Sequence, residues 1–369
     1  MAKRQRTTEK LFTKAFSVVS ECPAATNGLK LIGTHDGTFH CDEALGCAML
    51  QMMPQWAGST VVRTRNLEEL AKCDIVIDVG AVYDHSTKRY DHHQRTFTSV
   101  LSDEHPDVSE ASRPEKFTTK LSACGLVYKH YGLTELLPAL TEGSGLPTSL
   151  LPTIYKKMYK GFVEEVDAID NGVDIAGDTP LKYKVSTNLS ARVGHLNPAW
   201  NEDGGKERRN ALFREAMELT GGEFRAALAR LTSSWWPARA IVEAAMDARA
   251  AVDASGQILL LEQYAPWQGH LGDLEAERGL EGHVLYTLFP DSGGSWRVQA
   301  VAKEGFTSRK ALPSTWRGVR DADLSAVAGI DGCVFCHNAG FIGGNATREG
   351  ALKMAKAALA FEEPAEEGK

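Results

Sequence analysis

The segment Leu29–Met53, "LKLIGTHDGTFHCDEALGCAMLQMM", decides the fold class. The apolar run "LKLIGTH" predicts a buried strand that ends at His35, and "CDEALGCAMLQMM" has the pattern of an amphipathic helix. Further along, "STVVRTR" predicts a second strand, "NLEELAKC" a short helix and "DIVIDVGAVYD" a third strand. Strands that alternate with short helices predict an α/β domain built on a parallel sheet.

Two polar residues fall where predicted strands end. His35 closes the first strand, and Asp78 follows the apolar "IVI" of the third. Ligands of parallel α/β sheets collect at the carboxyl ends of the strands, so both residues are candidate site residues. A buried carboxylate is costly unless it is paired or bound to a metal. The alternative for Asp78 is an acid satisfied by backbone donors of the next turn.

Two further clusters contain candidate metal ligands. The turn after the first strand contains His40 and Asp42, and "RYDHHQRTF" contains Asp91, His92 and His93. Imidazole beside carboxylate is metal-ligand chemistry when other ligands converge on it. For the first cluster the alternative is a helix start, where the dipole favours acids by about 0.3–1 kcal/mol.

The last cluster, "EEVDAIDNG", places Glu164, Asp167 and Asp170 three residues apart on one helical face. The helix dipole disfavours negative charge near this C-terminus, so a Lys, an Arg or a cation should compensate, unless the face is simply solvated. Carboxylates and imidazoles without thiolates favour Mn²⁺ or Mg²⁺ over a structural zinc. Several carboxylates indicate more than one ion, as in two-metal phosphoryl chemistry.

The motifs together resemble a known family. "IGTHDGTFHCDEAL", "DIVIDVG", "YDHHQRTF", "KLSACGLVY", "FVEEVDAIDNG", "LSARVGHLNP" and "GFIGG..TREGAL" are similar to those of the melanocyte-proliferating-gene protein family of the DHH phosphoesterase superfamily. The resemblance runs from about Leu29 to Ala360. It implies a DHH-type parallel-sheet domain flanked by helices, a smaller α/β substrate-binding domain, and a metal-dependent 3′-to-5′ RNA exonuclease of mitochondria or nucleus.

The resemblance also implies roles for individual residues. One ion would be held by His35, His40 and Asp78, and the other by Asp42, Asp78, His92 and Asp170, with Asp78 bridging. Asp91 would orient His92, and His93 would face the substrate phosphate. The implied catalytic residues are Asp78, His92 and His93. The implied cofactors are two divalent ions, Mn²⁺ in preference to Mg²⁺. The substrate contacts would be His93, Arg95, Arg192, Gly343, Gly344 and Arg348.

The motif "GFIGGNATREGALKMAKAAL" predicts a strand joined to a helix by a glycine-rich turn, whose amides could bind an anion. The alternative is a tight β-to-α connection. DHH proteins usually carry a histidine just after the glycines, where this chain has Asn345, so a histidine role is in doubt there.

Composition limits the remaining possibilities. At 369 residues and 43% hydrophobic, the chain predicts two domains. The seven cysteines are an odd number, which argues against a secreted disulfide framework. No apolar run approaches the roughly 20 residues of a membrane span, which predicts a soluble protein without a membrane partner. The net charge of −7 means that a nucleic-acid substrate needs a local basic track.

The sequence predicts four parts: an N-terminal tail or targeting segment (1–28), a catalytic metal-binding domain (29–253), a substrate-binding domain (254–361) and an acidic tail (362–369). The basic, hydroxyl-rich N-terminus resembles an organellar transit peptide. "KRQR" could instead be a nuclear address, and a disordered tail is the third possibility. Residues 102–116 are predicted to form an exposed loop. The alternative functions are a small phosphoanhydride or dinucleotide hydrolase, and a metal-binding scaffold without activity.

Overall fold

A computed structural model describes residues 11–26, 28–102, 117–177, 179–202, 204–304 and 307–363. The chain forms two compact units, Met1–Thr232 and Ser233–Lys369. The predicted boundary lay near residue 253, at the change from helix-rich to strand-rich sequence. The structure instead groups the last long helix before that point, α9, with the second unit, because it packs on strand β7.

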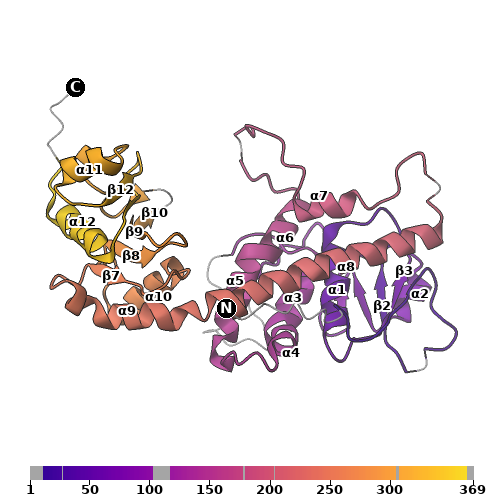
Figure 1. The fold of residues 1–369 in the computed structure, drawn as a ribbon. Coiled ribbons are helices and arrows are strands. Elements are labelled where there is room, and N and C mark those ends of the chain that lie inside the picture. The colour runs from indigo at the N-terminus through magenta and orange to yellow at the C-terminus, as the bar shows by residue number, and fades with distance from the viewer. Residues whose placement is uncertain are drawn as a thin grey trace. The chain divides into compact units, whose positions relative to one another are not determined.

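Unit 1 contains a six-stranded sheet with the order β1-β3-β2-β4-β6-β5 (Figure 1). All neighbours are parallel except the edge pair β5 and β6. The predicted parallel α/β domain is confirmed. Its strands are β1 (Val18–Val19), β2 (Leu31–Thr34), β3 (Thr60–Arg63), β4 (Ile75–Ile77), β5 (Tyr83–Asp84) and β6 (Arg89–Tyr90).

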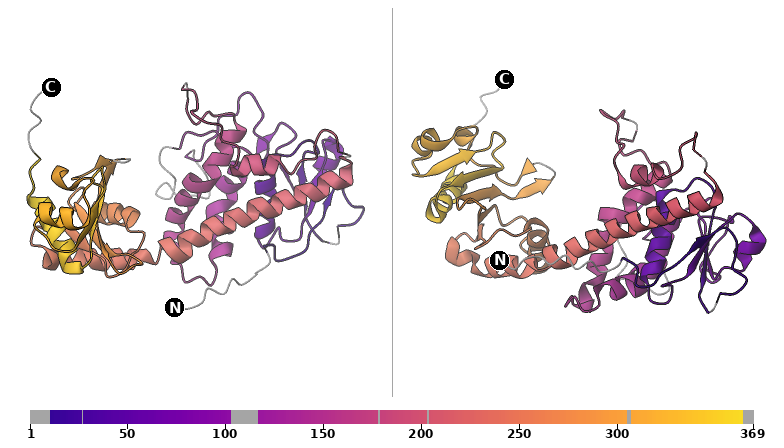
Figure 2. Two further views of the ribbon diagram at one scale, coloured as in Figure 1. Left: turned by 45° about the horizontal axis from the view of Figure 1, so that its top comes forward. Right: turned by 45° about the vertical axis from the view of Figure 1, so that its right-hand side comes forward.

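Helices surround this sheet, and the long α8 packs against α1 and β1 and runs along unit 1 in both views of Figure 2. The helices α5 and α6 form one continuous rod through η4, whose turn is π-helical. The helical elements are α1 (Cys41–Met52), α2 (Leu67–Ala71), α3 (Ala123–Tyr131), η2 (Gly132–Leu136), α4 (Leu137–Thr141), η3 (Thr148–Leu150), α5 (Leu151–Met158), η4 (Tyr159–Val163), α6 (Glu164–Asp170), α7 (Leu189–Gly194) and α8 (Lys206–Arg230).

The N-terminal segment differs from the expected tail. Val18 and Val19 pair with β3 as the edge strand β1, and the Phe16 ring is buried beneath the guanidinium of Arg214. Residues 11–19 are therefore part of unit 1 rather than a separable tail. The basic residues before Leu11, and most of the predicted loop over 102–116, lie outside the described residues.

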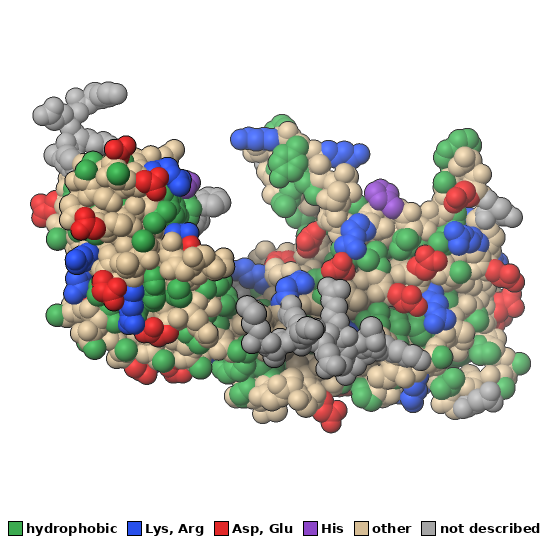
Figure 3. Space-filling view, in the orientation of Figure 1, with side chains coloured by type: hydrophobic (Ala, Val, Ile, Leu, Met, Phe, Trp, Pro, Cys, Tyr) green, Lys and Arg blue, Asp and Glu red, His purple; other side chains and the backbone are tan. Residues whose placement is uncertain are grey.

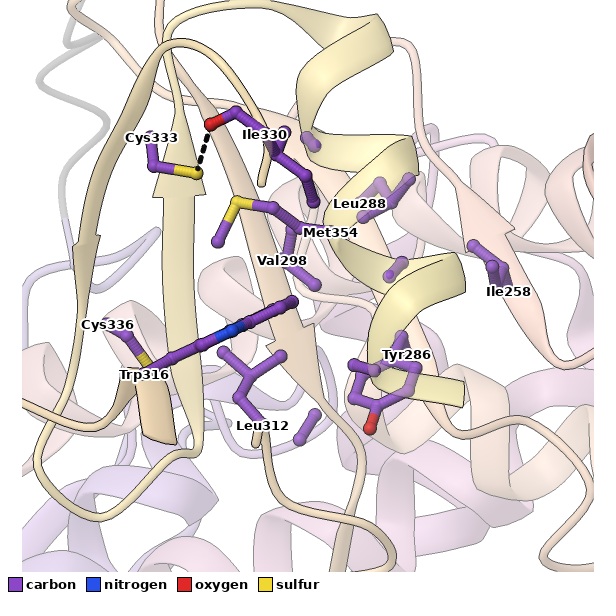
Figure 4. Packing of buried hydrophobic residues seen from close by; sticks show 14 of the residues in the cluster. Ile258, Tyr286, Leu288, Val298, Leu312, Trp316, Ile330, Cys333, Cys336 and Met354 are labelled. Atoms are coloured by element: carbon purple, nitrogen blue, oxygen red, sulfur yellow. Dashed lines mark hydrogen bonds between the residues drawn. The ribbon is translucent and has the colours of Figure 1, made fainter. Parts of the chain in front are cut away.

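Unit 2 has a five-stranded sheet of order β12-β13-β9-β8-β7, mixed rather than parallel, and a small β10–β11 ribbon. Its core lies between the sheet and α12, where Val298, Leu312, Trp316 and Met354 pack together (Figure 4). Its elements, with the connecting η5, are η5 (Leu231–Trp235), α9 (Ala238–Val252), β7 (Ile258–Leu260), α10 (Gln268–Arg278), β8 (Tyr286–Pro290), β9 (Trp296–Ala300), β10 (Ala302–Glu304), β11 (Thr307–Ser308), η6 (Ser314–Trp316), α11 (Asp321–Ala328), β12 (Cys333–Cys336), β13 (Ile342–Asn345) and α12 (Arg348–Ala360).

The described helices include none that is both long and apolar enough to cross a membrane. All seven cysteines are free thiols.

Candidate metal centre

The carboxyl ends of β2 and β4 bring His35 and Asp78 together, as the strand pattern predicted. His35 Nε2 lies 3.3 Å from Asp78 Oδ2. Asp78 follows β4 with a left-handed backbone (φ 59°), which turns the chain sharply after the buried "IVI". Only a few residue types other than glycine adopt this conformation readily, and aspartate and asparagine are among them.

Glu43 is a member of the cluster that the sequence interpretation missed. Its Oε1 lies 3.0 Å from His35 Nε2, and the carboxylate also accepts the backbone N–H of His40 at 2.9 Å. His35, His40, Glu43 and Asp78 each bring a ligand atom within 4.8 Å of one another. Glu43 is the third residue after the N-cap His40, so the same buried carboxylate caps the start of α1 and belongs to the cluster.

His92 lies at the centre of a second group of acids. Its Nε2 is 3.1 Å from Asp170 Oδ2, 3.3 Å from Asp78 Oδ1 and 3.8 Å from Asp42 Oδ2. Asp78 therefore lies between the two groups, one oxygen facing His35 and the other facing His92. Asp170 ends α6, so the predicted positive partner near this helix C-terminus includes His92.

Asp91 does not orient His92, which corrects the expectation from the motif. Its Oδ1 lies 2.7 Å from His93 Nδ1 and accepts the backbone N–H of His93, while Oδ2 accepts the N–H of Ala81. Asp91 is buried, whereas the His93 side chain is 63% exposed. Because Nδ1 faces Asp91, the other ring nitrogen of His93 is left for a ligand.

The donor set fits a divalent cation. Among the described residues, buried Asp42 Oδ1, Asp78 Oδ1 and both ring nitrogens of His92 have no hydrogen-bond partner. Buried polar atoms are normally satisfied, so their convergence marks a place where a ligand supplies the missing interactions. Hard oxygen donors mixed with imidazole favour Mn²⁺ or Mg²⁺.

Electrostatics support the same conclusion. Burial lowers the pKa of His92, but Asp170 and Asp78 outweigh it and raise the pKa to about 9. Burial raises the pKa of Asp42, and the charges of Asp78, Asp170 and Glu43 raise it further. Burial also raises the pKa of Asp78, but the adjacent imidazoles of His35 and His92 lower it to about 2. Without a metal, protons offset part of the clustered negative charge, and a cation would replace them.

His35 is a less simple case than His92. Burial lowers its pKa, and Asp78 and Glu43 raise it to about 9. The amide of Gly37, which lies 3.2 Å from Nδ1 and donates to it, favours the neutral ring instead. His92 therefore gives the clearer electrostatic argument for a cation.

The N-terminus of α3 supports Asp42. The Ala123 N–H donates to Asp42 Oδ2 at 3.2 Å, and the preceding Ser122 is held by Asp167, which accepts both its N–H and its hydroxyl. A Cβ on Gly125 would lie 2.3 Å from Asp167 Oδ2, so this packing requires glycine. Burial raises the pKa of Asp167 to about 7. Asp167 thus positions α3 and lies outside the group of candidate ligands.

Two more supporting residues, Asn197 and Arg63, were not assigned a role from the sequence. The Asn197 side chain accepts the Phe39 N–H and donates to the Phe39 carbonyl, which fixes the turn before His40. Arg63 is buried beneath the same turn, where it stacks on Phe39 and donates to the Gly37 carbonyl at 2.8 Å.

The predicted phosphate-binding arginines lie in different surroundings. Arg95 is exposed, and Arg192 on α7 pairs with Glu223 at 2.9 Å. A further arginine beside the DHH motif, Arg89, donates to the carbonyls of Cys73, Thr87 and Lys88, so its guanidinium stabilises the local backbone.

The predicted glycine-rich turn of the second domain is a strand, which is a correction. Gly343 and Gly344 lie in β13, whose backbone pairs with β9 and β12 on both sides. Their amides therefore belong to the sheet. A Cβ on Gly344 would lie 2.5 Å from an Arg297 nitrogen, and one on Gly343 would lie 3.0 Å from Leu312 Cδ1, so close packing explains both glycines.

The helix side of this motif also has structural contacts. Arg348 starts α12 and pairs with Glu262 at 2.9 Å. Asn345, in place of the expected histidine, is fully buried and donates to the Asp331 carbonyl while it accepts the Thr347 N–H. Its side chain therefore connects the strand to the start of α12.

Comparison with known proteins gives independent evidence about the family of this chain. Residues 31–359 match the family model MYG1_exonuc, described as "Uncharacterised protein family (UPF0160)". The chain is 49% identical to the MYG1 exonuclease of Mus musculus over 89% of this chain and 84% of that protein. It is 47% identical to the MYG1 exonuclease of Homo sapiens, with 89% and 85% covered. It is 43% identical to the MYG1 protein of Dictyostelium discoideum, with 88% and 94% covered.

Among solved structures, a crystal structure of exonuclease RecJ bound to manganese matches at 16% identity, covering 93% of this chain and 94% of that chain, with a TM-score of 0.22. A TM-score this low carries no argument about fold or chemistry. The family match needs no such support, because the model spans most of the chain and the relatives are covered over most of their length. The chain belongs to the MYG1 exonuclease family.

Proposed function

We propose that this protein is a divalent-metal-dependent nuclease, a 3′-to-5′ exonuclease that hydrolyses phosphodiester bonds of single-stranded RNA at a dinuclear site. The observation that carries the proposal is the position of Asp78 between two groups of donors, together with the buried atoms there that lack hydrogen bonds. The exonuclease names of the relatives support the reaction class.

His35, His40, Glu43 and Asp78 would hold one ion, and Asp42, Asp78, His92 and Asp170 the other. We favour Mn²⁺ over Mg²⁺ because imidazole ligands occur in both groups. When bound, divalent ions stabilise the negative charge that develops on the phosphate and lower the pKa of water.

The protein's own contribution begins with His93. Asp91 fixes Nδ1, so the exposed ring can donate from Nε2 to a phosphate oxygen and neutralise charge there. Arg95 and Arg192 would add positive charge for the substrate, and Arg192 would exchange Glu223 for a phosphate. In unit 2, Arg348 would exchange Glu262 for a phosphate, whereas the amides of Gly343 and Gly344 pair within the sheet. We propose location in mitochondria, the nucleus or both.

The test uses purified full-length protein, stripped of metal with a chelator and then supplied with Mn²⁺, Mg²⁺ or Zn²⁺. End-labelled single-stranded RNA, single-stranded DNA, dinucleotides and pyrophosphate are offered separately. Stepwise shortening of 5′-labelled RNA supports the proposal. Cleavage of dinucleotides or pyrophosphate alone would instead indicate the small-substrate hydrolase, and no turnover with any metal would indicate a scaffold.

A further inference from the structure

A long irregular segment connects α6 to α7, from Asn171 to Asn188, and we call it the α6–α7 arm. Loops this long without secondary structure of their own are uncommon in compact domains and usually functional. In Figure 3 the arm projects from the surface of unit 1, and hydrophobic and basic side chains lie next to one another on it.

The arm exposes large apolar side chains to an unusual degree. Ile175 is 85% exposed and Tyr183 is 78% exposed, and Leu181 and Val185 are nearly half exposed. Single exposed apolar residues are normal, but a group of them on one segment marks an interaction site. The arm therefore has the composition of a contact surface.

Charge indicates what this surface contacts. In "LKYKV", Leu181–Val185, the exposed lysines Lys182 and Lys184 flank Tyr183 on a chain whose net charge is −7. The arm's two acids, Asp174 and Asp178, both precede Leu181 in the sequence, and Asp174 accepts the N–H of Ala176. An aromatic ring between basic side chains is the chemistry that binds a single strand: bases stack on the ring, and the cations contact phosphates.

The position of the arm agrees with this chemistry. Its first residue follows Asp170, which lies 3.1 Å from His92, and its far end leads into α7, which packs against α1 and α6. Tyr183 is six residues before Leu189, a span of at most about 20 Å. A strand with its end among the candidate ligands could therefore contact the arm with nucleotides farther along.

We propose that the α6–α7 arm binds the single strand beyond the cleaved end, with Tyr183 stacking on a base and Lys182 and Lys184 contacting phosphates. This assignment rests on the proposed nuclease function, and Lys182 and Lys184 would supply positive charge to the strand at this end of the arm. It makes Tyr183 a residue that positions substrate without touching the reacting phosphate.

Direct binding tests the assignment without turnover. Fluorescence anisotropy of labelled single-stranded RNA or DNA of about 20 nucleotides is measured in excess chelator, across a range of salt concentrations. Tyr183→Ala should weaken binding about tenfold, the effect of losing one base stack, while Tyr183→Phe should bind like wild type. The double variant Lys182→Ala, Lys184→Ala should reduce the salt slope by about 1.4, since each phosphate contact on a single strand contributes about 0.7.

The control is Lys160→Ala, another exposed lysine of unit 1 outside the arm, which should leave the affinity and the salt slope unchanged. Turnover provides a second readout. The arm variants should raise KM for long RNA and leave kcat for a dinucleotide unchanged, because a dinucleotide is too short to contact the arm.

Equal binding of wild type and Tyr183→Ala would overturn the proposal. The proposal would also fail if the arm variants shifted a monomer–dimer equilibrium in sedimentation without changing the affinity for RNA. The arm would then contact a second copy of the protein. The arm variants could bind RNA more weakly although the wild-type protein hydrolyses no nucleic acid. That result would support the RNA-binding role of the arm and reject only the nuclease proposal.

Discussion

Replacing Asp78 by asparagine tests the candidate metal centre most directly. The change removes one negative charge, keeps almost the same volume, and leaves a residue that tolerates the left-handed backbone found there (φ 59°). The fold should therefore persist. Turnover on single-stranded RNA should collapse, because the carboxylate between the two donor groups is the one that both ions would share.

The stability cost can be worked from the pKa of Asp78. Burial raises this pKa, but His35 and His92 lower it from 3.8 to about 2, which corresponds to about 2 kcal/mol in favour of the folded protein near neutral pH. A depressed pKa stabilises above the unfolded value of 3.8, and the contribution is lost as pH falls through about 2. Without metal at about pH 6, Asp78→Asn should therefore lower Tm by about 4–8 °C.

Stabilisation by added metal distinguishes a metal centre from a simple buried ion pair. Wild type should gain about 2.7 kcal/mol when free Mn²⁺ is one hundred times the dissociation constant, and Asp78→Asn should gain little. The control is Asp36→Asn, a half-exposed acid of the neighbouring turn that lies 3.7 Å from Arg65. Calorimetry with and without Mn²⁺, beside turnover, gives both quantities. Wild-type turnover and full metal stabilisation in Asp78→Asn would refute the dinuclear assignment.

Three other changes test the surroundings of the centre. Gly125→Ala should destabilise unit 1 by several kcal/mol in denaturant unfolding, because its Cβ would lie 2.3 Å from Asp167. The control Gly222→Ala, with open space around it on α8, should stabilise the protein by up to about 1 kcal/mol, and equal effects of the two changes would contradict the packing argument. Asp167→Asn should flatten the dependence of stability on pH, because burial raises the pKa of this carboxyl to about 7 and its stabilising contribution, present below about pH 4, is lost as pH rises through 7. Unfolding measured at each pH should show a difference between wild type and variant that changes by up to about 4 kcal/mol over this range. Parallel profiles would show that this carboxyl does not titrate with a raised pKa. Asp91→Asn should reduce kcat by about 10²-fold or more while the Mn²⁺-induced rise in Tm persists, since it disturbs the ring of His93 and none of the residues proposed to hold an ion; loss of the metal effect would instead assign Asp91 or His93 to the centre.

The sequence predicted the parts of unit 1 whose signal is local. The strands β2, β3 and β4 and the helix α1 follow from apolar periodicity, which burial of one face or both faces imposes directly. The convergence of His35 and Asp78 followed from a topological rule, because parallel strands end at the same edge of the sheet. The other candidate ligands were assigned from the family resemblance.

Features that depend on contacts between distant segments could not be predicted in the same way. The pairing of β1 with β3 involves only Val18 and Val19, too short a run to show a period. The partner of Asp91 depends on the backbone turn between adjacent residues, and "DHH" permits either histidine. Gly343 and Gly344 suggested a turn by composition, but Arg297 and Leu312 of other elements fill the space beside them.

The buried acids of unit 1 show how packing and chemistry depend on each other. Asp167 has every acceptor role filled by Ser122, Cys124 and Tyr159, so its charge state concerns only the fold. Asp42 and Asp78 keep buried oxygens without donors, which a fold selected for stability alone would have replaced by apolar groups. Asp167 holds the N-terminus of α3 through Ser122, and the next residue, Ala123, donates to Asp42. A substitution of Asp167 should therefore also disturb the position of Asp42. The hydrogen bonds of a buried carboxylate therefore show whether it stabilises the fold or is available to a ligand. The spacing of Asp167 and Asp170 in the sequence could not make this distinction.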